Sequence, residues 1–377
     1  LAVQIAALGF LFGQVQAYLQ SLPGAIMRFD VSAKIEASFG VALPVLTVAL
    51  LYTGKGLIEV ICLRVLMSAI QTAVLMAALN TLLPGFRPAW PTNEARQRLL
   101  NYSVFAFLSR IAAVTYTHAD KLLIGARVGM DALTQYALPT TLTNRVMSLV
   151  FRLSGVMLPH SSSLAAAGRN AELEQHYLVA SRYMFYINGA ISITLAALSE
   201  PILKMWLTPD FALQGAHVMS MIAMSQFVDS LTNLPSLLND GLGHPKVTGS
   251  FALARAAVGL GLIVVGVNIY GIEGAAAGHL IASIVMSGIF LIYSHGRTVP
   301  VRLIKLANQA YVKPLFALLP IGWVTLSLRH WAQNGWFELT LVVVLCAVLY
   351  CCGAWILVLR REDRNTIVQG LRMRYQR

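Results

Sequence analysis

The segment "FELTLVVVLCAVLYCCGAWILVL", residues 337–359, runs directly into the basic tail "RREDRNTIVQGLRMRYQR", residues 360–377. The first stretch carries a single charged side chain, that of Glu338. About 20 consecutive apolar residues are enough to cross the hydrocarbon core of a bilayer. Backbone groups in lipid must be hydrogen-bonded within their own segment, so the stretch predicts a membrane-spanning helix.

The composition extends this prediction to the whole chain. Of its 377 residues, 57% are hydrophobic and 12% are charged, and the mean hydropathy is +0.67. Soluble domains carry about 25% charged residues, so a soluble protein is excluded. We therefore expect an all-α polytopic membrane protein. The four cysteines lie in apolar runs without metal-ligand spacing, and we expect neither a metal site nor a disulfide framework.

A search for further apolar runs predicts about eleven transmembrane helices. They cover residues 1–20, 37–54, 57–80, 99–126, 132–158, 183–199, 211–238, 247–268, 271–293, 314–329 and 337–359. Pro44, Pro139 and Pro235 fall inside three of these spans and are expected to kink or loosen them. Gly274 and Gly278 form a small-xxx-small pair, which predicts close helix packing.

Basic residues set the predicted orientation. The tail 360–377 holds six arginines against two acids, which places the C-terminus in the cytoplasm. Alternation then assigns 18 Lys and Arg to cytoplasmic loops and five to the outer side. The net charge of +12 is therefore read as a topology signal, and no nucleic-acid partner is expected. With eleven spans Leu1 falls on the outer side, so we expect an odd number of helices to be missing upstream.

Arginines inside the predicted spans are the candidate substrate-binding residues. Each would cost roughly 3 kcal/mol facing lipid, so they should face a watery cavity, an acid or a ligand. Arg145 and Arg152 share one helical face with Thr134, Thr141 and Ser148. Few acids lie at the same depth, so we expect a net positive cavity and an anionic, phosphate-bearing cargo. The candidates are Arg64, Arg110, Arg145 and Arg152.

Three further charged residues lie within the predicted spans: Asp120, Lys121 and Asp229. They are candidates for ion coupling or gating, and the two aspartates could equally be counter-ions to the arginines. The chain has no nucleotide-binding loop and no catalytic metal motif, so we expect no ATPase domain and no cofactor. Short loops argue against an enzyme with an extramembrane site.

Residues 117–177 carry a more specific signal. The pattern "THADKLLIGARVGMDALTQYALP", with Asp120, Lys121, Gly125 and Tyr136, resembles the seventh and eighth helices of Wzx-type polysaccharide flippases. These belong to the multidrug/oligosaccharidyl-lipid/polysaccharide exporter superfamily. The resemblance implies two helical lobes around a central cavity, with the N-terminal helices missing here. Residues 1–98 would be the remainder of the first lobe, 99–300 a second six-helix lobe and 301–377 two additional helices and the tail.

The resemblance also implies a function. It predicts translocation of undecaprenyl-diphosphate-linked oligosaccharide, such as an O-antigen unit of lipopolysaccharide, across the bacterial inner membrane by alternating access driven by an ion gradient. Expected partners are the lipid-linked oligosaccharide, membrane lipids and polysaccharide assembly proteins. A multidrug/cation antiporter is disfavoured by the excess of arginine. A lipid II flippase stays open, and a membrane enzyme of polysaccharide assembly is the alternative from another class.

Overall fold

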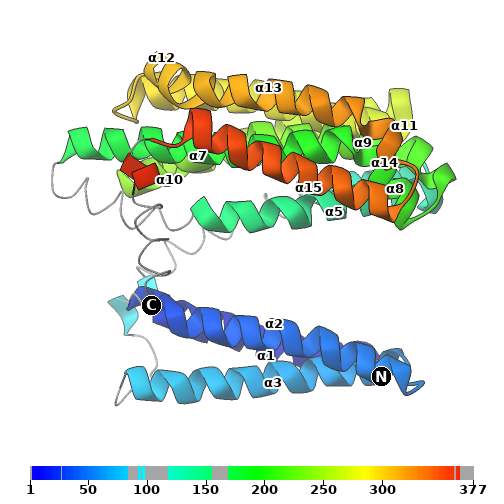
Figure 1. Ribbon diagram of the computed structural model, residues 1–377. Coiled ribbons are helices and arrows are strands. Elements are labelled where there is room, and N and C mark those ends of the chain that lie inside the picture. Colours follow the sequence, from blue (N-terminus) through cyan, green and yellow to red (C-terminus); the bar gives the residue numbers. More distant parts are fainter. Residues whose placement is uncertain are drawn as a thin grey trace, which may run out of the picture. The chain divides into compact units, whose positions relative to one another are not determined.

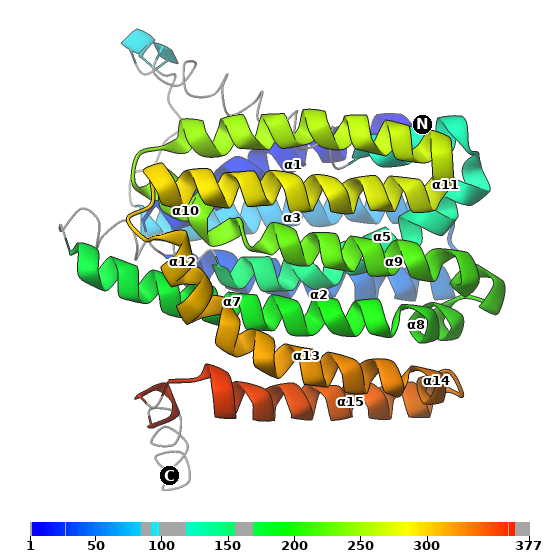
Figure 2. The same ribbon diagram turned by 90° about the horizontal axis from the view of Figure 1, so that it is seen from above.

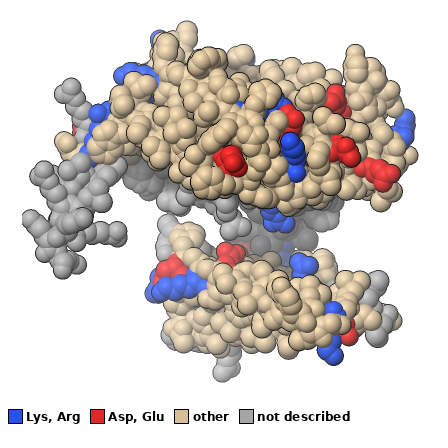
Figure 3. All heavy atoms as spheres, turned by 45° about the vertical axis from the view of Figure 1, so that its right-hand side comes forward, with Lys and Arg blue, Asp and Glu red and all other residues tan. Residues whose placement is uncertain are grey.

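The structure is a computed structural model that describes residues 2–26, 28–83, 92–94, 96–97, 118–154, 169–360 and 362–365. Every regular element among these residues is a helix, which confirms the all-α prediction. The chain divides into two compact units, Leu1–Arg98 and Leu99–Arg377 (Figure 1). Uncharged side chains make up most of the visible surface of each, with only scattered charges (Figure 3), as expected of helices that face lipid.

Unit 1 is made of three long helices: α1 (Ala2–Ala25), α2 (Phe29–Tyr52) and α3 (Leu57–Leu82). α3 packs against both of the others. Leu19 of α1 meets Leu75 and Leu79 of α3 in a small buried cluster. α2 buries none of its residues fully, so the three helices leave much apolar surface exposed. The short turn before α3 includes Gly54 with φ +77°, a left-handed conformation that glycine adopts without strain.

Unit 2 is a bundle with α9 at its centre. Its elements are a helical segment at 118–127, α5 (Met130–Ser154), α7 (Asn170–Ala197), α8 (Ser199–Trp206), α9 (Pro209–Ser230), α10 (Asn233–Gly241), α11 (Pro245–Arg297), α12 (Leu303–Leu306), the π-helical turn η1 (Ala307–Tyr311), α13 (Val312–Ser327), α14 (Arg329–Ala332), α15 (Trp336–Gly353) and the π-helical turn η2 (Ala354–Val358). α9 packs against α5, α7, α8 and α11, and α13 and α15 lie along the outer side of α7 (Figure 2).

The predicted single span 211–238 is wrong, because it is two helices. α9 ends at Ser230 and α10 begins at Asn233. Pro235 has no N–H to donate, and its ring would clash with the carbonyl of Leu231 in a continuous helix. Leu231 and Thr232 instead close tight turns onto the carbonyls of Val228 and Asp229. Pro235 therefore breaks the helix, whereas Pro44 and Pro139 lie inside the continuous helices α2 and α5.

α11 is a helical hairpin. Non-helical backbone at Tyr270 and Gly271 separates its two halves, which run side by side in opposite directions (Figure 2). Gly271 has φ +58°, in the left-handed region. The two predicted spans 247–268 and 271–293 correspond to the two halves. A methyl group at Gly278 would lie 2.7 Å from the carbonyl oxygen of Leu262, so the predicted close packing around the small-xxx-small pair is confirmed.

The predicted number of spans is not confirmed. Among the described residues, five helices are long and apolar enough to cross a membrane, or six if α7 and α8, bent by 62°, form one broken span. Part of the difference arises because the α11 hairpin counts as one helix. The polar stripe of α5 lowers its apolar content, and most of the predicted span 99–126 lies outside the described residues.

One predicted loop is largely helical. Residues 159–182 read as a cytoplasmic loop because of their charges, yet α7 begins at Asn170. The first turns of α7 are amphipathic, and they bury Leu173, Tyr177 and Leu178 against residues of α10 and the α11–α12 connection. This cluster brings together parts of three segments predicted on the cytoplasmic side: 159–182, 239–246 and 294–313. When successive helices cross the membrane in opposite directions, every second loop lies on the same side. The contact between these three segments agrees with that arrangement.

Candidate functional site

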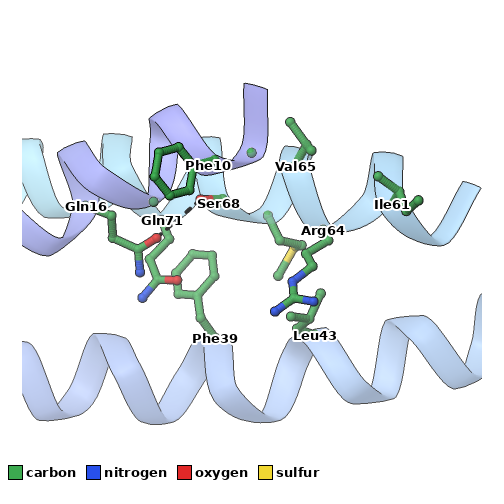
Figure 4. A pocket seen from close by; sticks show the side chains of 12 residues that line it. Phe10, Gln16, Phe39, Leu43, Ile61, Arg64, Val65, Ser68 and Gln71 are labelled. Atoms are coloured by element: carbon green, nitrogen blue, oxygen red, sulfur yellow. Dashed lines mark hydrogen bonds between the residues drawn. The ribbon is translucent and has the colours of Figure 1, made fainter. Parts of the chain in front are cut away.

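Unit 1 contains a cavity of about 540 Å³ between its three helices. Residues from α1 and α3 form most of the wall, and α2 closes one side through Phe39 and Leu43 (Figure 4). The lining residues in the described part of the chain are Gly9, Phe10, Gly13, Gln16, Phe39, Leu43, Ile61, Arg64, Val65, Met67, Ser68 and Gln71. It combines an apolar and aromatic wall with four polar side chains, which is the usual make-up of a small-molecule site.

Arg64 supplies the only charge among the described residues of this lining. Its guanidinium extends from α3 towards α2 and ends beside Leu43 (Figure 4). Ser68 and Gln71 follow one and two turns later on the same face of α3. The acids of unit 1 at 30, 36 and 59 contact other groups: Asp30 pairs with Arg28 at 3.0 Å, Glu36 accepts from Gln20, and Glu59 accepts from the backbone of Gly56. The pocket therefore carries a net positive charge.

The arginines predicted in unit 2 are only partly described. Arg145 is exposed on α5, next to the exposed Thr141 and the half-buried Ser148, whose hydroxyl donates to the Arg145 carbonyl at 2.8 Å. The opposite face of α5 is buried through Tyr136, Thr140 and Thr143. The polar stripe on α5 is thus an accessible helix face. Arg110 and the side chain of Arg152 lie outside the described residues.

Asp120 is anchored to α5. The carboxylate is 2% exposed and accepts a hydrogen bond of 2.8 Å from the Tyr136 hydroxyl and one of 2.7 Å from the backbone N–H of Lys121. These two bonds satisfy both carboxylate oxygens with neutral donors. Lys121 is half-buried on the same helical segment. The ion-coupling or gating role predicted for both residues stays a prediction.

Asp229 forms an ion pair with Arg255, joining the end of α9 to the first half of α11. Both side chains are largely buried, at 13% and 21% exposed. The same Arg255 nitrogen, Nη2, donates to Ser283 Oγ at 3.1 Å. Asp229 Oδ1 is buried without a hydrogen-bond partner in the described part of the chain. The contact makes Asp229 a counter-ion to an arginine, and the ion-coupling or gating role predicted for it stays a prediction.

The ion pair continues into a buried polar network. Ser283 is joined to Ser225 at 2.7 Å, and Ser225 to His279 Nδ1 at 2.9 Å. Asp120, Asp229 and Arg255 all act electrostatically on His279. Sequence reasoning did not single out His279, because a lone histidine in a glycine- and alanine-rich helix gives no spacing signal. A cavity of about 120 Å³ borders the network at Arg255, and Thr232 and Ser236 are further polar residues of its lining.

The comparisons with known proteins agree with this architecture. The model of a family described as "Polysaccharide biosynthesis protein" matches residues 1–213, more than half of the chain. The chain belongs to this family. The match covers all of unit 1 and the part of unit 2 that holds Asp120, Arg145 and Arg152. The predicted resemblance to polysaccharide flippases of the exporter superfamily is thereby confirmed.

The fold is that of a solved flippase. The chain is similar to the structure titled "Lipid II flippase MurJ, inward closed conformation", with a TM-score of 0.69 over 95% of this chain and 73% of that chain. The sequence identity is 15%, so the similarity speaks for the fold. No curated protein matches the chain. The protein is thus a multi-pass membrane protein of a transporter family, and the prediction that it is not an enzyme is confirmed.

Proposed function

We propose that the chain flips undecaprenyl-diphosphate-linked oligosaccharide across the bacterial inner membrane. Membership of the polysaccharide biosynthesis family narrows the cargo to precursors of polysaccharides. The observation that carries the proposal is the cavity of unit 1, in which Arg64 is the only charged lining residue among those that the structure describes. A guanidinium held between apolar helices favours an anionic ligand, and its fork of N–H donors matches a diphosphate.

Arginines in each unit are proposed to bind the anionic cargo. Arg64 contributes from unit 1, and Arg145 contributes from the exposed stripe of α5, with Arg110 and Arg152 as further members of the predicted set. A diphosphate bound by several arginines loses its water shell at lower cost, because each charge-assisted hydrogen bond replaces a bond to water. The path is therefore proposed to be cationic.

Alternating access requires a contact that can open, and the Asp229–Arg255 pair is the proposed gate. It lies within three residues of the break between α9 and α10, where the backbone is already turned. The ion pair can break, and the neighbouring ends of the helices can move apart, when a ligand or ion offers Asp229 or Arg255 another partner. Asp120 and Lys121 are proposed to sense the coupling ion from the neighbouring helical segment.

Substitution of the arginines tests the proposed cargo. We expect Arg64→Gln and Arg145→Gln each to lower flipping about ten- to a hundredfold, because each removes a charge-assisted bond worth about 1.5–3 kcal/mol. The full-length protein would be expressed in a bacterium that lacks its own flippase, and lipid-linked oligosaccharide would be followed on each membrane face. Arg169→Gln, at an exposed surface pair, is the matched control. Normal flipping by both variants would contradict the proposal.

The fold of MurJ favours one second candidate, a flippase of lipid II. Both cargoes are lipid diphosphates, so the arginines are consistent with either. The same host experiment separates them if a strain depleted of its lipid II flippase is used in parallel. Rescue of that strain, without transfer of the oligosaccharide carrier, would favour the lipid II assignment.

The C-terminus is proposed to lie in the cytoplasm, on the side of the clustered loops. Thr208, exposed between α8 and α9, and Asp240, exposed at the end of α10, belong to loops assigned to opposite sides. In the full-length protein with its native cysteines replaced, we expect Thr208→Cys to react with a membrane-impermeant maleimide in intact cells. Asp240→Cys should react only after permeabilisation. The reverse pattern would invert the topology.

A further inference from the structure

The unit 1 cavity contains uncharged polar side chains in addition to the arginine that would bind a diphosphate. Besides Arg64, the lining holds Gln16 from α1 and Ser68 and Gln71 from α3, and the two glutamines are half-buried. Gln71 lies roughly 20 Å along α3 from its first residue, so the amides are deep within a membrane-spanning helix. Amides at this depth are costly unless they meet polar partners.

From this lining we infer that the cavity binds sugar residues of the cargo, beyond the diphosphate. This inference rests on the proposed function. Primary amides and hydroxyls both donate and accept hydrogen bonds, as do the hydroxyl groups around a sugar ring. Ser68 already donates to Gln16 Oε1 at 3.3 Å, which orients the Gln16 amide nitrogen away from α3 and leaves it able to donate.

The aromatic side chains supply the second element of sugar recognition. Phe10 of α1 and Phe39 of α2 flank the amides, and Figure 4 shows the Phe39 ring between Gln71 and Arg64. One face of a pyranose ring presents C–H groups that pack on an aromatic face, while its hydroxyls reach the polar groups around it. Amides flanked by aromatic rings therefore suit a sugar better than an inorganic ion or a lipid tail.

The size and charge of the cavity narrow the ligand further. Its volume of about 540 Å³ falls within the range of sites for small organic molecules. A methyl group built on Gly13 would have no heavy atom within 4 Å, so the cavity has room for a sugar ring at this position. Arg64, at one end of the polar row, is the residue proposed to bind the diphosphate, so the sugar residues would lie next to it, along Ser68 and Gln71. The preferred ligand is therefore the part of the glycan that is attached to the diphosphate.

Binding measurements on the full-length protein in lipid nanodiscs test the inference. The two probes are undecaprenyl-diphosphate-linked oligosaccharide from the host and undecaprenyl diphosphate without sugar, quantified by native mass spectrometry. We expect Gln71→Leu and Gln16→Leu each to weaken binding of the glycosylated lipid about three- to tenfold, since each removes hydrogen bonds worth about 0.5–1.5 kcal/mol. Binding of the bare lipid should stay within twofold of the wild type.

Gln14 offers a matched control on the same helix. It is exposed and does not line the cavity, so Gln14→Leu should leave binding of both lipids unchanged. Equal weakening of both lipids by the Gln71 variant, or no weakening by either variant, would overturn the inference while the proposed flippase function stands. If the wild type binds neither lipid better than an ordinary phospholipid, the proposed function fails as well.

Discussion

Replacing Arg255 with methionine is expected to lower the free energy of unfolding by about 3–5 kcal/mol and to abolish flipping. The change leaves the carboxylate of Asp229 buried at 13% exposure without its cationic partner. One of its oxygens already has no hydrogen-bond partner within the described residues, so the substitution removes the charged donor of the other oxygen as well. Breaking a buried ion pair by removing one partner costs about this much because an uncompensated charge remains.

A double variant separates stability from gating. Asp229→Leu combined with Arg255→Met removes both charges and replaces them with side chains of similar size, which is often neutral for stability. We expect the double variant to recover most of the lost unfolding free energy and still fail to flip its cargo. Thermal unfolding of the purified full-length protein and the sidedness assay give the two readouts.

An exposed ion pair serves as the control for the stability measurement. Arg169 pairs with Glu172 at 2.6 Å, with both side chains well exposed. Exposed pairs contribute about 0–1 kcal/mol, so Arg169→Met should change the unfolding free energy by less than about 1 kcal/mol. Normal flipping by the Asp229→Leu/Arg255→Met variant would show that the pair only joins α9 to α11, and the proposed gate would then be wrong.

The class of fold could be predicted from the sequence because apolar runs and their boundaries are local signals. Ten of the eleven predicted spans coincide with helices in the described residues, although the span 211–238 is divided and the helix at 183–199 begins earlier. The early start of α7 escaped prediction because its charged residues resemble a loop. The first turns of α7 are stabilised by the burial of Leu173 and Tyr177 against α10 and the α11–α12 connection. These tertiary contacts are not visible in the sequence.

The candidate site could be predicted only in part. Arg64 stood out as a charge within an apolar run, but Gln16, which lines the same cavity, lies on another helix, 48 positions earlier in the sequence. Asp229 was likewise singled out, whereas its pairing with Arg255, 26 positions away, depends on how α9 meets the α11 hairpin. A single charged residue within an apolar run can be recognised from the sequence. Its partner on another helix cannot, because helix packing determines which residues meet.

Substitution of Gly274 by alanine is expected to be, together with that of Gly266, among the most damaging single methyl additions in the described part of unit 2. A methyl group there would overlap the backbone carbonyl of Gly266 on the opposite half of the α11 hairpin, and the mirror contact holds for Gly266. Two backbones in direct contact cannot be relieved by a side-chain rotation, so the hairpin must open. Glycines that let transmembrane backbones approach this closely are common at helix interfaces.

We expect Gly274→Ala to lower the free energy of unfolding by about 3 kcal/mol, at the upper end of the usual cost of overpacking. It should also lower flipping, because the second half of α11 carries His279 and Ser283 of the network that includes the Asp229–Arg255 gate. The measurements are thermal unfolding and the yield of monodisperse full-length protein, followed by the sidedness assay on whatever folded protein is recovered.

Gly261 provides the matched control, because it lies in the same hairpin with no heavy atom within 4 Å of an added methyl group. Alanine favours a helix interior over glycine by up to about 1 kcal/mol, so Gly261→Ala should leave stability unchanged or raise it. The two substitutions add the same atom and should act with opposite sign. If Gly274→Ala were as stable as Gly261→Ala, the close contact between Gly266 and Gly274 would not exist in the folded protein, and the hairpin would have to pack through other residues.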